Sequence, residues 1–145
     1  MGYVFTEVTL KNSRDTTDVV RGINKESEIR QKTVQALVDT GAFTLVITEK
    51  LRQELGLEIK GKKEVSLANN ERIICQRTEP VEIHWKDRYS TLSALVVPDR
   101  KNVLLGVFPL EEMDLIVDPV RQELTGAHGD EWVCYLCSPF SDTSL

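Results

Sequence analysis

The sequence predicts an all-β fold, a barrel or sandwich with one or two short helices. Many short apolar segments follow the two-residue period of strands. Polar, turn-forming residues separate them, and only one segment has clear helical spacing. A chain of 145 residues has the size of one domain with a single core. We expect that domain to cover residues 1–127, followed by a tail of unknown role over residues 128–145.

The first half of the chain is predicted to hold three strands and the clearest helix. Residues 48–56 are typical of a helix because Thr48 can cap its start and Gly56 can end it. An apolar run directly precedes a turn at residues 39–42, which places that turn at the end of a buried strand. The expected strands cover residues 3–10, 29–38 and 43–47, with polar links over residues 11–18 and 21–28.

The second half is predicted to hold three hairpins and one short buried strand. Two asparagines can form the first turn, since Asn tolerates a positive φ. Pro109 is permitted at the start of a helix, so one or two helical turns are expected over residues 109–114. The expected hairpins pair residues 65–67 with 72–76, 81–85 with 89–97, and 115–117 with 121–124, and the short strand covers residues 103–105.

Charge and composition exclude several classes of protein. The net charge is −5 and the basic residues are dispersed, which disfavours a nucleic-acid partner. The chain has no run of about 18 apolar residues and no secretory signal, so no membrane association is expected. Three cysteines with no disulfide-like spacing indicate a reducing compartment, and we expect a cytoplasmic protein.

An Asp-Thr-Gly sequence is the strongest chemical signal. Asp39 directly follows an apolar strand, where a carboxylate is costly unless something solvates it. Gly41 lets the backbone turn tightly and direct amide donors at that carboxylate, and the Thr40 hydroxyl can hold the turn. The motif alone is more often an ordinary turn aspartate, but the apolar strand before it, the later Leu104-Leu105-Gly106 and the all-β pattern together favour a reactive carboxylate.

The segment Asp39-Thr40-Gly41-Ala42 resembles the active-site loop of retropepsins, the family of retroviral proteases and their cellular relatives. The later Leu104-Leu105-Gly106 is similar to the family's second element, which packs behind that loop. The resemblance spans about residues 5–125 and looks closer to the bacterial and archaeal branch than to the viral enzymes. It implies a retropepsin-like acid protease barrel, with a flap over residues 65–76 whose substrate-binding tip is Ala68, Asn69, Asn70 and Glu71.

Two positions depart from the family pattern. Viral enzymes usually carry acidic residues just after the alanine, where this chain has Phe43 and Thr44. The flap tip has Asn69 and Asn70 instead of a Gly-rich run. The resemblance therefore does not carry over the substrate-backbone contacts of those acids or the mobility of the flap.

The chemistry implied by the resemblance needs two carboxylates. One accepts a proton from water while the other protonates the peptide carbonyl, and two such groups about 3 Å apart share a proton. No second Asp-Thr-Gly or Asp-Ser-Gly exists, since Asp99, Asp118 and Asp142 precede Arg, Pro and Thr. We therefore expect an aspartic endopeptidase, active only as a homodimer in which two copies of Asp39 meet. Its partner is a peptide or protein substrate, and no cofactor or metal is expected.

Two other hypotheses stay open. The chain can be a binding or structural module that keeps the barrel without the activity, which the polar C-terminal tail favours because it offers no obvious dimerising strand. It can also be a regulatory partner that acts through Cys134 and Cys137, a CxxC pair that is half of a zinc site.

Overall fold

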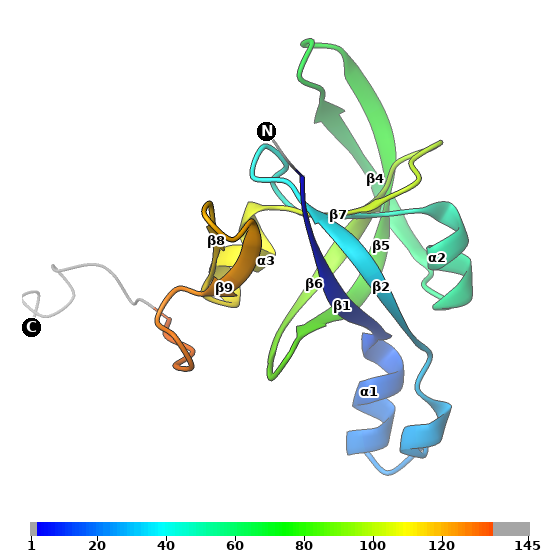
Figure 1. Ribbon diagram of the computed structural model, residues 1–145. Helices are drawn as coiled ribbons and strands as arrows, with labels where there is room; N and C mark the ends of the chain where they lie inside the picture. Colours follow the sequence, from blue (N-terminus) through cyan, green and yellow to red (C-terminus); the bar gives the residue numbers. More distant parts are fainter. Residues whose placement is uncertain (1–2, 135–145) are drawn as a thin grey trace, which may run out of the picture.

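The chain folds around a closed barrel of six strands (Figure 1). The computed structural model describes residues 3–134. Neighbouring strands pair in the order β1-β2-β7-β3-β6-β5, and pairing of β1 with β5 closes the ring. The all-β prediction is confirmed. The barrel strands are β1 (Val4–Asn12), β2 (Gln31–Val38), β3 (Leu45–Ile47), β5 (Arg72–Trp85), β6 (Arg88–Val96) and β7 (Val103–Leu105).

The barrel interior is filled by every second residue of each strand. Successive side chains in a strand point to opposite faces, so one set enters the core. Each fully buried aliphatic side chain contributes about 1.5–3 kcal/mol to folding. The interior side chains include Val8, Leu10, Ala36, Leu45, Ile47, Val81, Ile83, Ala94, Val96, Val103 and Leu105.

Strand β5 is long enough to belong to two structures at once. Its second half pairs with β1, and its first half pairs with β4 (Ile59–Ser66) to form a hairpin that projects beyond the barrel (Figure 1). The prediction of separate strands over residues 72–76 and 81–85 is wrong, because the strand continues through a pairing irregularity between Arg77 and Pro80. The predicted arm over residues 65–67 is also too short. Residues 60–64 are exposed, so they lack the alternation that reveals a half-buried strand.

One helix lies where the sequence predicted a polar link. Helix α1 (Ser13–Val20) buries only Asp15, so it has almost no apolar face to detect. Its start is fixed by Asn12, whose Oδ1 accepts hydrogen bonds from the amides of Arg14 and Asp15. The buried side-chain amide of Asn12 also donates, through Nδ2, to the carbonyl of Leu55 at 2.9 Å. This one side chain therefore connects the start of α1 to the end of the next helix.

The other helices follow the sequence more closely. Helix α2 (Glu49–Glu54) is confirmed with its predicted cap, since Thr48 Oγ1 accepts from the Leu51 amide at 3.1 Å. Helix α3 (Val107–Glu112) begins two residues earlier than predicted. Pro109 still lies in its first turn, where amides have no partner within the helix. A short 3₁₀ turn (Glu26–Glu28) precedes β2. No helix among residues 3–134 is both long and apolar enough to cross a membrane.

The predicted last hairpin is confirmed as β8 (Leu115–Asp118) and β9 (Glu123–Gly126), a separate two-stranded sheet. Leu115 and Leu124 join the main core. Residues 128–134 contact the barrel through Arg88 of β6. The buried Arg88 guanidinium donates to the carbonyls of Met113, Asp114, Gly129 and Glu131. The predicted boundary between residues 127 and 128 stays a prediction, because the rest of the tail lies outside the described residues.

An ion pair fixes α1 against the strand that leads to Asp39. Asp15 is buried, and its carboxylate accepts from Arg30 Nε at 2.8 Å and from the Arg30 amide at 2.9 Å. These hydrogen bonds from Arg30 hold the pKa of Asp15 below its usual value. A lowered pKa in the folded state means that the pair stabilises the fold above about pH 4 and stops doing so as acid protonates the carboxylate.

We predict that Asp15→Asn lowers the free energy of unfolding at pH 7 by about 1 kcal/mol. Hydrogen bonds to charged groups contribute about 1.5–3 kcal/mol. Solvent weakens this pair because the Arg30 side chain is 45% exposed. Urea unfolding from pH 7 to pH 3 should show the difference from wild type shrinking below about pH 4. Asp18→Asn on the same helix is the control, and an equal effect of both changes would contradict the assignment.

Candidate active site

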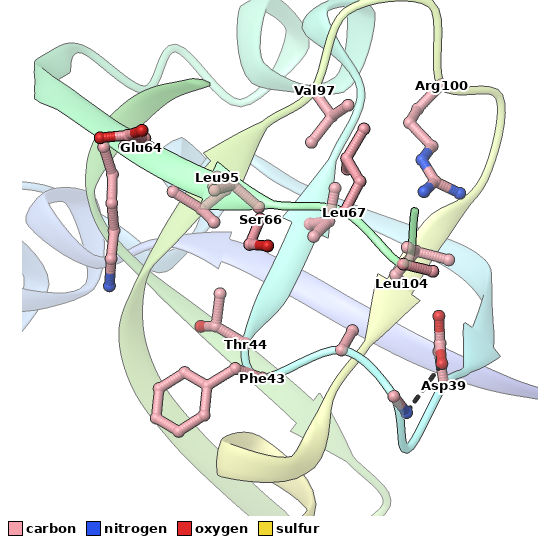
Figure 2. Close-up of a pocket in the computed structure, with 16 residues that line it drawn as sticks. Asp39, Phe43, Thr44, Glu64, Ser66, Leu67, Leu95, Val97, Arg100 and Leu104 are labelled. Carbon is pink, nitrogen blue, oxygen red and sulfur yellow. Dashed lines mark hydrogen bonds between the residues drawn. The ribbon is translucent and has the colours of Figure 1, made fainter. Parts of the chain in front are cut away.

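Asp39 lies at the end of β2, in the turn that leads to β3. Its amide donates to the Leu105 carbonyl at 3.0 Å, and its own carbonyl accepts from the Ala42 amide at 3.0 Å. The Gly41 amide donates to the carboxylate Oδ1 at 2.9 Å (Figure 2). The Asp39 side chain is half-buried and Thr40 is exposed. The turn therefore holds one carboxylate oxygen and leaves the other available for chemistry.

Strand β7 packs directly behind this turn. Leu104 and Leu105 pair in parallel with β2 and antiparallel with β3, so one short strand joins both ends of the turn. Gly106 continues past the turn, and the next two amides donate to the carbonyls of Ala42 at 2.9 Å and Phe43 at 2.8 Å. The sequence prediction that residues 104–106 lie behind the Asp39 loop agrees with this geometry.

A cleft of about 460 Å³ opens beside Asp39. One side is an apolar surface in which Val46, Leu95 and Leu104 form a second hydrophobic cluster around the buried Cys75. Burial raises the pKa of the Cys75 thiol, so that residue is part of the apolar packing. The other side is the β4–β5 hairpin, which contributes residues 63–68 (Figure 2). The cleft thus lies between the barrel wall and the projecting hairpin.

The tip of the hairpin is a tight three-residue turn. The Leu67 amide donates to the Glu71 carbonyl at 2.7 Å, and the Asn70 amide donates to the Leu67 carbonyl at 2.9 Å. Asn70 has a φ of +67°, which is the left-handed position of this kind of hairpin loop. The expectation that asparagine would supply a positive φ agrees with the structure.

The predicted site residues divide into two groups. Asp39, Gly41, Ala42, Ala68 and Leu104 line the cleft. Six others do not line it. Thr40, Leu105 and Gly106 belong to the Asp39 loop and its support, and the exposed hairpin tip holds Asn69, Asn70 and Glu71.

Sequence reasoning missed Arg100 and Lys63, which also line the cleft, whereas Ser66 lies within the predicted flap. The Arg100 position was detectable, because the turn at residues 97–102 leads directly into the strand behind Asp39. Lys63 lies on the part of β4 that was not predicted.

The candidate metal site in the tail is not tested by the structure. Among residues 3–134, no three His, Cys, Asp or Glu side chains lie together in a way that could hold a metal ion. Cys134 is exposed, and Cys137 lies outside the described residues. The CxxC hypothesis therefore stays a prediction.

We predict that Gly106→Ala destabilises the fold by about 3 kcal/mol. An added Cβ would lie 2.6 Å from the Ala42 carbonyl oxygen and 2.7 Å from the Thr44 nitrogen, which are both backbone atoms of the loop. Gly61→Ala is the matched control, since nothing lies within 4 Å of its added Cβ. Urea unfolding of both variants measures the difference, and equal stabilities would show that the loop and β7 can separate at little cost.

Comparison with known proteins agrees with this geometry. A family model described as aspartyl protease matches residues 10–107, and no curated protein matches the sequence. The EIAV protease in complex with the inhibitor HBY-793 is 21% identical with a TM-score of 0.51, covering 72% of this chain and 82% of its own. The retroviral protease-like domain of Ddi1 from Leishmania major is 14% identical with a TM-score of 0.55, covering 86% and 88%. These structures share the fold, while membership of the bacterial and archaeal branch stays a prediction. The chain belongs to the aspartyl protease family and has a retropepsin-like fold.

Proposed function

We propose that the chain is an aspartic endopeptidase that acts as a homodimer, with one Asp39 from each copy. The observation that carries this proposal is the Asp39 carboxylate, which is held by the Gly41 amide at 2.9 Å and opens onto a cleft large enough for a peptide segment. Membership of the aspartyl protease family supports the same chemistry.

A second copy is needed because the cleft of one chain lacks a suitable second carboxylate. Among the described residues, the acidic side chains that line it are Asp39 and Glu64. Glu64 lies at the opposite end of the cleft from Asp39 (Figure 2) and faces Arg72 at 3.5 Å on the exposed hairpin. Two-fold association of two Asp39 loops would supply the missing group.

The reaction follows from two carboxylates that hold one proton between them. The ionised carboxylate accepts a proton from a water molecule as its oxygen attacks the scissile carbonyl carbon, and the other carboxylate donates its proton to the carbonyl oxygen. Collapse of the tetrahedral intermediate breaks the C–N bond, with a proton transferred to the leaving amine. The β4–β5 hairpin, including the flap tip at residues 68–71, would hold the peptide by strand-like backbone hydrogen bonds.

A binding module without activity is the second candidate. One observation favours it: residues 128–134 contact α3 and the link to β8 in the same chain, where the Val133 amide donates to the Asp114 carboxylate at 3.2 Å and Trp132 Nε1 donates to the Glu112 carbonyl at 2.9 Å. These contacts within one chain compete with the use of this segment as an intermolecular strand. A monomer on a sizing column at high concentration, with no cleavage from acidic to neutral pH, would favour this candidate.

We predict that Asp39→Asn lowers kcat by at least about 10³-fold while the fold stays intact, because the amide cannot exchange the proton that the reaction requires. The Asn oxygen can still accept the Gly41 amide, so urea unfolding should match wild type within about 0.5 kcal/mol. Asp87→Asn, at an exposed position in the β5–β6 turn, is the control.

Mixing wild-type and Asp39→Asn chains, after exchange of subunits, tests whether the active site is shared. If both carboxylates are needed, only dimers of two wild-type chains cleave, and activity falls with the square of the wild-type fraction. A linear fall would show that each chain works alone and would contradict the shared site.

A further inference from the structure

We propose that the cleft selects an acidic peptide, with an apolar side chain at its centre and Asp or Glu side chains toward its ends. This inference deepens the proposed peptidase function and rests on it for cleavage. The binding preference itself does not need catalysis, so the two can fail separately.

The cleft continues into a second hollow of about 200 Å³. The two share Phe43, Thr44, Lys63 and Leu95, and the second adds Arg77. The strand register explains how the two cations come together. Lys63 lies opposite Cys75 and Arg77 lies opposite Leu95, so all four side chains are on the same face of the sheet. The same face carries the apolar cluster that borders the cleft, so Lys63 and Arg77 lie at one end of that cluster.

A third cation lies at the other end. Arg100 lines the cleft together with Asp39 and Leu104, and Figure 2 shows Arg100 and Asp39 at one end with Glu64 and Phe43 at the other. Its loop is shaped by Asp99, which has a φ of +63°. A guanidinium is always charged and can bind a carboxylate through two parallel hydrogen bonds.

Within the part of the chain that the structure describes, these three cations have no carboxylate partner. Among residues 3–134, Lys63, Arg77 and Arg100 form no salt bridge. The carboxylates that line the two hollows are Asp39, which the reaction uses, and Glu64, which faces Arg72. A chain with a net charge of −5 thus presents unpaired positive charge along its cleft. That charge is complementary to an acidic ligand and repels a basic one.

The middle of the cleft requires an apolar group. Val46, Leu95 and Leu104 line the cleft, and Figure 2 shows Leu95 and Leu67 between Glu64 at one end and Arg100 at the other. Burying a polar side chain against these residues without a partner would be unfavourable. An extended peptide advances about 3.3 Å per residue. A central apolar residue therefore places residues a few positions away on either side near the cations.

The test uses the full-length Asp39→Asn protein and fluorescent peptides with blocked ends. The peptides share one apolar centre and carry Glu, Gln or Lys at the flanking positions. Exposed ion pairs each change an equilibrium roughly 1.5- to 5-fold, so the Glu peptide should bind about tenfold more tightly than the Gln peptide at low salt. The difference should shrink at high salt, and the Lys peptide should bind most weakly.

Matched variants assign the effect to these residues. Lys63→Gln combined with Arg77→Gln, and separately Arg100→Gln, should each lower the ratio of the affinity for the Glu peptide to the affinity for the Gln peptide. Lys62→Gln changes the same charge on the opposite face of β4 and should keep the full preference. Equal binding of the three peptides, no binding of any, or the same loss with Lys62→Gln would overturn the inference.

Cleavage by the wild-type chain separates this inference from the proposed function. Cleavage of all three peptides at equal rates would support the peptidase and contradict the acidic preference. Selective binding of the Glu peptide with no cleavage would contradict the peptidase and support the preference.

Discussion

The close approach of β7 to the Asp39 loop is the constraint on which the rest of the site depends. Three residues carry it: Leu104 and Leu105 pair with both β2 and β3, and Gly106 passes the loop where no side chain would fit. Backbone hydrogen bonds in a packed interior hold atoms more accurately than side-chain contacts do. The carboxylate is therefore positioned by main-chain geometry, and the proposed homodimer would need such positioning because two copies of Asp39 would have to meet across its symmetry axis.

The same strands form the core on one side and the cleft on the other. Leu105 enters the barrel interior while its neighbour Leu104 faces the cleft cluster, and in β3 Leu45 and Ile47 enter the core while Val46 faces the cleft. This division follows from the two-residue period of a strand. A shift of one residue in the β3–β7 register would exchange the two surfaces, so core packing also fixes which side chains line the cleft.

Much of this arrangement could be predicted because the barrel strands carry their own signals. The strand before Asp39, the short strand at residues 103–105 and the capped helix after Thr48 all follow from apolar runs, turn residues and caps in the sequence. What could not be predicted are the parts stabilised without an apolar face. Helix α1 depends on the side chains of Asn12 and Asp15, whose partners lie in distant segments. Strand β4 is exposed along most of its length, so its sequence lacks the alternation that reveals a half-buried strand.

The buried hydrophobic residues form two clusters of unequal size. The main cluster closes the barrel and includes residues from α2, α3 and the β8–β9 hairpin, while the smaller one lies between the barrel wall and the β4–β5 hairpin. The arms of that hairpin are largely exposed, with Ile74 69% accessible. Regions with few buried apolar contacts open at low free-energy cost. We therefore expect the hairpin to open at a lower free-energy cost than the barrel strands do. An extended peptide that enters below it would add apolar contacts to the smaller cluster, so the hairpin would become most ordered when the cleft is filled.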